Sequence, residues 1–404
     1  MDRRTPPRLV LLAAVVVGCI MLGSLRLKRP GDLGLDLAVY RVAADAWLSG
    51  GPLYDVSPAR APEFTFLYPP VAVLAFVPFA VVPEAVALVA FSALNVATGL
   101  ALAWVLVRYL RGRGVDLARA DVALLAAACT VSGYRGASLF FSQVNVFLAL
   151  ALAVGFVALE REREALAGAA LALPAFLKLF PAVVGAWLLR RRAWRGVGAA
   201  VAVGLGLHLL GALVFGPDLV AAYVEVVLSE RTGVGVFAGG LAPTETYLTL
   251  HRAGSHLVGG GSLARYGVAA AILLPALAVC YRDTSMPDRR LTAWFATLVA
   301  MLLGFPSYQV YVGLLLFPLF ALLYLFPPGR ARLLFLGGAA LSTTVYAGGE
   351  FVAAAAAVPV AGGLLAGVLR PVLTLAAPAT YGLLCCLAAC VAFHLGDGST
   401  GGAP

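Results

Sequence analysis

Charged side chains are scarce in this sequence. Of its 404 residues, 12% are Asp, Glu, Lys or Arg and 62% are hydrophobic, and the mean hydropathy is +0.94. A soluble globular chain is about a quarter charged, because it needs polar residues to cover its core. The composition therefore excludes a water-soluble enzyme or binding domain and predicts an integral membrane protein.

Strand-like patterning and metal-ligand clusters are also lacking. No segment alternates apolar and polar residues with a period of two, which argues against an outer-membrane barrel. The sequence has only four histidines, and its six cysteines all lie within apolar runs without metal-ligand spacing. We interpret the cysteines as small buried hydrophobic residues and expect no metal site and no cofactor. The sequence leaves the participation of a divalent metal open.

Long apolar runs, in contrast, are abundant. Runs of about 18 to 25 residues recur from end to end, the length that a helix needs to cross a bilayer. Arg3, Arg4 and Arg8 precede the first run, so the N-terminus is expected in the cytoplasm. We predict an all-α polytopic membrane protein with roughly 12 to 13 transmembrane helices. The chain is expected to form one integral membrane domain over 1–404, with a large first outer loop over 26–83 and a second over 216–262.

The net charge of +9 follows this topology. Arg and Lys gather in short loops expected on the cytoplasmic side, such as the arginines over 108–119, so no nucleic-acid partner is predicted. The apolar run over 71–82 is short and contains Pro78. We interpret it as a half-buried helix, because a crossing there would turn the arginines over 108–119 outward.

A lysine and two prolines interrupt the apolar run over 165–189. Pro174, Lys178 and Pro181 predict a discontinuous helix or a helical hairpin with Lys178 at its outer tip. The remaining apolar runs are expected to cross singly: 84–107, 121–139, 142–159, 197–215, 263–280, 291–305, 308–326, 333–346, 351–368 and 372–393.

The first outer loop carries the carboxylate of most interest. Asp36 opens an amphipathic helix, where it shares a face with Tyr40 one turn later. Asp36 is either an N-cap of that helix or a general base held at the membrane surface. Asp32, Asp45 and Asp55 are weaker candidates.

Lys178 is the most specific polar signal inside an apolar run. Its ammonium either binds a lipid phosphate as a point charge or reaches the membrane surface by snorkelling. Arg252 and His251, in the second outer loop, are candidates for a further phosphate contact, and Glu245 could pair with either. The alternative is that these three are ordinary loop charges.

Tyr40, Glu245 and three further polar side chains are candidates for substrate binding. Tyr68 precedes two prolines that make a rigid entry into the bilayer. Gln143 and Asn145 begin an apolar run, where amides bind substrate or simply hydrogen-bond a neighbouring helix.

Five motifs follow one another in a recognisable order. They read GLDLAVY over 34–40, GGPLY over 50–54, FLYPP over 66–70, SQVN over 142–145 and AFLKLFP over 175–181. Together they resemble glycosyltransferase family 87, which comprises polyprenyl-phosphate-mannose-dependent mannosyltransferases and their relatives in the GT-C superfamily. The resemblance covers 30–200 well, and the rest of the chain only in its hydrophobic layout.

The resemblance implies a multi-pass cell-membrane enzyme with its active site facing outside the cytoplasm. The donor would be a polyprenyl-phosphate sugar, with mannose expected, and the acceptor a lipid or glycan. By resemblance, Asp36 is the general base of an inverting transfer, and we expect Lys178 and Arg252 to neutralise the departing phosphate. The chain departs from the family over 305–311, where FPSYQVY lacks the two histidines that many members carry, and this leaves the sugar and acceptor undetermined.

Two other functions are compatible with part of this pattern. A transporter or flippase of lipid-linked sugars would share the many spans, the broken helix and the buried lysine. It would not need a long outer loop that bears a carboxylate. A structural membrane subunit would need neither Asp36 nor Lys178.

Overall fold

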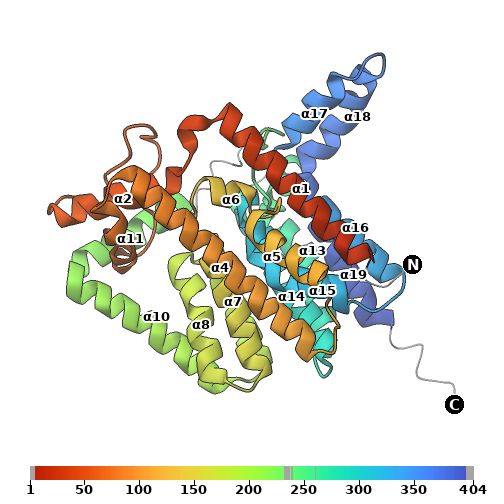
Figure 1. Cartoon of the computed structure of the whole chain (residues 1–404), viewed down its shortest axis with the longest axis horizontal. Helices are drawn as coiled ribbons and strands as arrows, with labels where there is room; N and C mark the ends of the chain where they lie inside the picture. The colour runs from red at the N-terminus through yellow and green to blue at the C-terminus, as the bar shows by residue number, and fades with distance from the viewer. Residues whose placement is uncertain (1–4, 232–236, 238–239, 260, 397–404) are drawn as a thin grey trace. The chain divides into compact units, whose positions relative to one another are not determined.

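The computed structural model describes residues 5–231, 237, 240–259 and 261–396 (Figure 1). Throughout these residues the secondary structure is helical, and the one strand-like pairing among them is an isolated bridge between Tyr247 and Tyr308. The predicted all-α fold is therefore confirmed.

Five helices in the described part of the chain are long and apolar enough to cross a membrane. They are α1 (Thr5–Lys28), α4 (Glu84–Gly112), α10 (Trp194–Phe215), α13 (Ser262–Arg282) and α19 (Pro378–Gly396). In the apolar window of α10 only 6% of the residues are buried, so the side of this helix that faces away from α8 is left for lipid. The protein is a multi-pass membrane protein, and the total number of spans stays a prediction.

Shorter helices fill the chain between these five. In chain order they are η1 (Pro30–Asp32), α2 (Leu35–Leu48), η2 (Pro70–Ala75), α3 (Val77–Ala80), α5 (Arg119–Val131), α6 (Gly136–Phe140), α7 (Asn145–Glu160), α8 (Glu164–Leu177), η3 (Phe180–Val184), α9 (Gly185–Arg190), α11 (Pro217–Arg231), α12 (His251–Leu257), α14 (Pro287–Gly304), η5 (Gln309–Leu315), α15 (Leu316–Leu325), α16 (Arg330–Ser342), α17 (Gly348–Ala356) and α18 (Gly362–Leu375).

The chain divides into two compact units, each assembled from separate segments. Unit 1 comprises Met1–Gly18, Leu106–Tyr134 and Val234–Pro404, and unit 2 comprises Cys19–Val105 and Arg135–Gly233.

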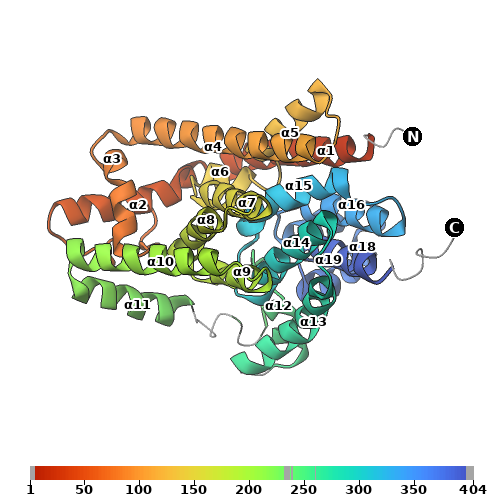
Figure 2. The ribbon, with the colours of Figure 1, turned by 90° about the horizontal axis from the view of Figure 1, so that it is seen from below.

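In unit 2, α7, α8, α9 and α10 run back and forth beside one another, as Figure 2 shows for α7, α8 and α10. Glycines let two of these helices meet backbone to backbone. A Cβ built on Gly168 of α8 would lie 1.8 Å from the carbonyl oxygen of Gly196 in α10, so no larger residue fits there.

The break in the run over 165–189 is confirmed. Between α8 and η3, Lys178 has an extended backbone, with φ −135° and ψ 111°. At the other end of these helices, Arg191 Nη1 lies 2.9 Å from Glu160 Oε1. Residues 160 and 191 therefore meet at one end of a helical hairpin, and Lys178 lies at its tip.

The first loop is a packed structure rather than a loose connection. Tyr40 of α2 stacks on Phe76, with ring centroids 4.3 Å apart. Arg41, on the same helix, donates from Nε to the carbonyl of Phe79 and from Nη2 to that of Val82, both at 2.7 Å. The run over 71–82 forms only η2 and α3, which confirms that it does not make a full span.

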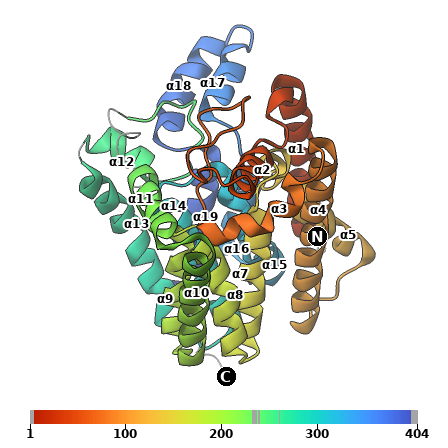
Figure 3. The ribbon, with the colours of Figure 1, turned by 90° about the vertical axis from the view of Figure 1, so that its left-hand side faces the viewer.

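One predicted span near the C-terminus is wrong. The run over 351–368 contains the end of α17, a turn and the start of α18, which lie side by side as a hairpin (Figure 3). Pro359 lies in the turn and has no N–H to continue α17, and Val360 follows it with φ +67°. The span predicted over 372–393 is confirmed from Pro378 onward as α19, and only its first residues belong to α18.

Four of the six cysteines are buried thiols, as the sequence predicts: Cys129, Cys280, Cys386 and Cys390. The interpretation is wrong for Cys19, which is exposed on α1, an apolar helix whose exposed surface suits lipid.

Candidate active site

The start of α2 is fastened to the end of α6 through the backbone. The N–H of Gly34 donates to the carbonyl of Phe140 at 2.9 Å, and the N–H of Asp36 donates to that of Phe141 at 3.0 Å. Gly34 is the N-cap of α2, with φ +69°, a left-handed conformation that glycine adopts without strain. Asp36 lies inside the first turn, so the N-cap interpretation of Asp36 is wrong, and its carboxylate is left for other contacts.

The Asp36 carboxyl group lies in a largely buried, polar site. Burial raises its pKa to about 6, although a hydrogen bond with the Gln143 side chain and the charge of Lys178 both lower it. Burial outweighs the two favourable contacts because water stabilises a carboxylate better than a low-dielectric interior does. At pH 7 the group is mostly ionised, yet it is a stronger base than an ordinary aspartate.

A chain of side-chain hydrogen bonds runs from Lys178 to Asp36. Lys178 Nζ donates to Asn145 Oδ1 at 2.9 Å, and Asn145 Nδ2 donates to Gln143 Oε1 at 2.6 Å. Gln143 has only its amide nitrogen left as a donor, so this nitrogen donates to the Asp36 carboxylate. Four predicted site residues, from α2, the α6–α7 turn, α7 and the hairpin tip, are thus brought together.

Lys178 is an internal cation. The residue is 4% exposed, so its ammonium does not reach the protein surface, and the snorkelling alternative is wrong. Its position follows from the prolines on either side, because Pro174 in α8 and Pro181 in η3 remove backbone donors and let the helix break between them. The Asn145 amide and the charge of Asp36 compensate this buried ammonium, so a fixed cation is held at the hairpin tip.

Tyr40 and Tyr68 contribute to the packing beside this site. Their hydroxyl oxygens are 3.2 Å apart, and the Tyr54 hydroxyl donates to the carbonyl of Tyr68 at 2.9 Å. Tyr40 and Tyr68 are both buried, and Tyr40 lies one helical turn from Asp36. Their role in substrate binding stays a prediction.

Glu245, His251 and Arg252 belong to unit 1. Arg252 donates from Nη1 to the carbonyl of Ala242 at 2.8 Å and from Nη2 to that of Glu245, and His251 Nε2 lies 3.0 Å from the carbonyl oxygen of Gly304. Burial lowers the pKa of His251, so the ring is neutral at pH 7. These contacts hold the second loop together, and the phosphate-binding role of this group stays a prediction.

Comparison with known proteins assigns the chain to a family. The profile of glycosyltransferase family 87 matches residues 66–307, more than half of the chain. The chain belongs to glycosyltransferase family 87. It is therefore a membrane glycosyltransferase. Over 173 residues it is 36% identical to the polyprenol-phosphate-mannose-dependent alpha-(1-2)-phosphatidylinositol pentamannoside mannosyltransferase of Mycolicibacterium smegmatis. The aligned region covers 42% of this chain and 40% of that relative. No solved structure matches the chain.

The family match includes Gln143, Asn145 and Lys178, whereas Asp36 precedes it. The hydrogen-bond chain thus links the region that matches the family to α2, which precedes that region. Among the described residues, no group of three or more His, Cys, Asp or Glu side chains is arranged to hold a metal ion.

Sequence reasoning did not single out two arginines of unit 2. Arg135, next to α6, is a buried guanidinium with 1% exposure, and Arg41 ties α2 to the carbonyls after α3. An arginine within the apolar stretch over 121–150 was the available signal for Arg135. Nothing local in the sequence indicates the contacts of Arg41.

Proposed function

We propose that this family 87 glycosyltransferase transfers mannose from polyprenyl-phosphate mannose to a glycolipid acceptor on the extracytoplasmic face of the cell membrane. The observation that carries the proposal is the buried chain from Lys178 through Asn145 and Gln143 to Asp36, which puts a cation at one end and a base with a raised pKa at the other. The donor and acceptor in the name of the Mycolicibacterium smegmatis relative support the choice of substrates.

The transfer is a single displacement. Asp36 takes the proton from an acceptor hydroxyl as that oxygen bonds to the anomeric carbon, and the bond from that carbon to the phosphate oxygen breaks on the opposite face. The electron pair leaves with the phosphate, so the products are the glycoside and a polyprenyl phosphate. One carboxylate suffices, because no covalent sugar–enzyme intermediate forms.

Lys178 stabilises the leaving group. As the bond to the phosphate breaks, negative charge builds up on the phosphate oxygens, and a preorganised ammonium in a low-dielectric site is well suited to neutralise it. Asn145 holds that ammonium in place through its 2.9 Å hydrogen bond.

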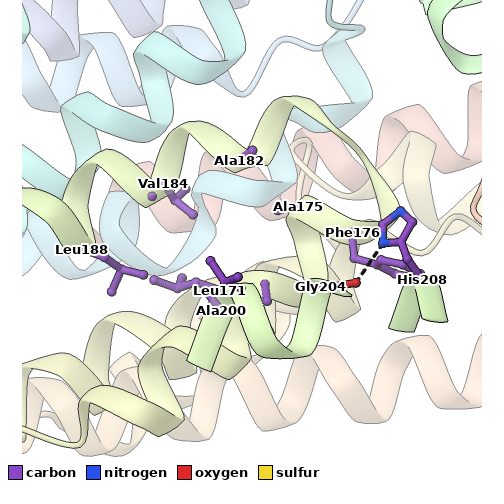
Figure 4. A pocket seen from close by; sticks show the side chains of 12 residues that line it. Leu171, Ala175, Phe176, Ala182, Val184, Leu188, Ala200, Gly204 and His208 are labelled. Carbon is purple, nitrogen blue, oxygen red and sulfur yellow. Dashed lines mark hydrogen bonds between the residues drawn. The ribbon is translucent and has the colours of Figure 1, made fainter. Parts of the chain in front are cut away.

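The prenyl chain has a suitable apolar cavity in the same unit. A cavity of about 270 Å³ lies between α8, α9 and α10, with Phe176 and His208 at one end and Leu188 at the other (Figure 4). Phe176 is two residues from Lys178, so a phosphate at the lysine would leave its lipid tail next to this cavity. His208 Nδ1 is occupied by the carbonyl of Gly204 at 2.8 Å, which leaves the lining almost wholly apolar.

The proposed sidedness rests on charge. The loops at the base of the hairpin carry Arg190, Arg191, Arg192 and Arg195, and such clusters stay on the cytoplasmic side. Lys178, at the opposite end of the hairpin, then faces the extracytoplasmic side.

The test is transfer by the purified full-length protein in vesicles. Polyprenyl-phosphate mannose and phosphatidylinositol mannosides are supplied, and the product is identified by mass. We expect a product one hexose heavier, lost in Asp36→Asn and retained in Asp45→Asn, a matched change at an exposed position of the same helix. Movement of labelled donor across the vesicle without a new glycosidic bond would identify a flippase and refute the proposal.

A further inference from the structure

A serine in a strained conformation lies beside the hydrogen-bond chain. Ser142, in the turn between α6 and α7, has φ +59°. Four non-glycine residues in the described part of the chain have a positive φ: Ser142, Glu162, Arg192 and Val360. Of these four, only Ser142 is buried, with 1% exposure. A buried residue held in the left-handed region is a form of strain that clusters at functional sites.

The side chain of Ser142 adds a second cost. Its Oγ is buried and has no hydrogen-bond partner among the residues that the structure describes. A buried hydroxyl without a partner destabilises the fold, and glycine at this position would remove both this cost and the backbone strain. A serine that is unfavourable in two independent ways indicates that its hydroxyl is used by a group bound from outside.

The surroundings of Ser142 identify that group. Its Oγ lies 3.8 Å from the position that a Cβ on Gly34 would take, and Gly34 is two residues before Asp36. The next residue along the chain is Gln143, which hydrogen-bonds the Asp36 carboxylate. The hydroxyl is therefore on the Asp36 side of the chain and not at the Lys178 end, where the phosphate is proposed to bind. The part of the donor nearest to Asp36 in the proposed reaction is the sugar.

We propose that Ser142 Oγ hydrogen-bonds a hydroxyl of the donor sugar and so helps to determine sugar specificity. This inference rests on the proposed function. A site hydroxyl paired with a sugar hydroxyl discriminates against donors that lack it, because the unpaired group stays buried. The contact also orients the ring so that its anomeric carbon faces the acceptor oxygen.

The test combines two variants with a series of donors. Ser142→Ala keeps the left-handed backbone and removes the hydroxyl, whereas Ser142→Gly removes both the hydroxyl and the strain. We expect both variants to lose about 3- to 12-fold in kcat/KM for polyprenyl-phosphate mannose, the effect of one neutral hydrogen bond. Ser142→Gly is also expected to unfold at a higher temperature than Ser142→Ala. Glu162→Gly, which relieves the same backbone conformation at an exposed turn, is the control and should transfer at the wild-type rate.

Deoxy donors separate a contact to the sugar from a structural role. Each hydroxyl of the mannose is removed in turn, and the kcat/KM of wild type and Ser142→Ala is compared. For one deoxy donor, the kcat/KM of the wild type should be well below its value for the mannose donor. For Ser142→Ala the kcat/KM values for these two donors should be equal, because the deoxy donor and the substitution remove the same hydrogen bond. Equal losses by Ser142→Ala on every donor, or wild-type transfer by Ser142→Gly, would overturn the inference while leaving the proposed function intact. If wild type makes no product at all, the proposed function itself fails.

Discussion

The replacement of Asp36 by asparagine separates chemistry from folding. Asparagine is nearly the same size and can keep a hydrogen bond with Gln143, but it cannot take a proton from the acceptor. General-base assistance contributes roughly 10²- to 10⁴-fold. We therefore expect Asp36→Asn to lose transfer by about that factor.

The same change should not harm the fold. The pKa of Asp36 is raised from 3.8 to about 6, and a rise of about 2 units corresponds to about 3 kcal/mol against the ionised form at neutral pH. Partial exposure of the residue reduces this figure. Because the pKa of Asp36 is higher in the folded protein than in the unfolded chain, the free energy of unfolding of the wild type falls by up to this amount as the pH rises from about 4 through 6. Asp36→Asn should therefore unfold at the same temperature as wild type or above it at pH 7.

The pH dependence of transfer supplies the decisive measurement. The ionised carboxylate is the active form, so wild-type transfer should rise with pH through an inflection near 6 and then level off. The kcat/KM for the donor, which reports the free protein, is measured in detergent or vesicles, with thermal unfolding recorded in the same buffers. Wild-type transfer by Asp36→Asn would falsify the assignment of the base. An Asp36→Asn protein that is also much less stable than wild type would contradict the electrostatic reasoning.

Three further predictions follow from the contacts in unit 2. Gln143→Leu removes a hydrogen bond that lowers the pKa of Asp36. The inflection of the pH–rate profile should therefore move to higher pH, and transfer at pH 6 should fall roughly tenfold. An unmoved inflection would show that Gln143 does not act on the base. Gly168→Leu should abolish folded protein on size-exclusion chromatography, because its Cβ meets the Gly196 carbonyl at 1.8 Å, whereas Gly198→Leu on the open side of α10 should fold. Ala200→Phe, which fills the cavity, should raise KM for a long-chain donor several-fold more than for a donor of two isoprene units; equal effects on both would exclude the cavity as the tail site.

The hairpin over 165–189 could be predicted from sequence because its causes are local. Two prolines and a lysine within one apolar run break a helix wherever the chain folds. The flanking charges also indicated which ends meet, and the contact between Arg191 and Glu160 agrees. Pro359 is also a local helix breaker, but it is a single residue in a run of apolar ones. The prediction followed the hydrophobicity of that run and therefore merged α17 and α18 into one span.

The connection between the site residues could not be predicted in the same way. Asp36 and Gln143 are far apart in the chain, and the backbone bonds from α2 to the end of α6 that bring them together leave no local signal in one sequence. The positive φ of Ser142 is equally hidden, because serine is common in turns and only burial makes it unusual. The types of the chemical groups could be inferred from the sequence, but their order along one hydrogen-bond chain could not.

That order has a consequence for the timing of the reaction. The charge of Lys178 lowers the pKa of Asp36 in the free protein. A donor phosphate bound at the lysine would neutralise part of this charge and add negative charge of its own, and both effects raise the pKa of the carboxylate. Asp36 would then become a stronger base only when a donor is in place. The inflection in kcat against pH, which reports the complex, should therefore lie above that in kcat/KM, which reports the free protein. Coincident inflections would mean that the phosphate does not bind at Lys178, and the hydrogen-bond chain would then be structural.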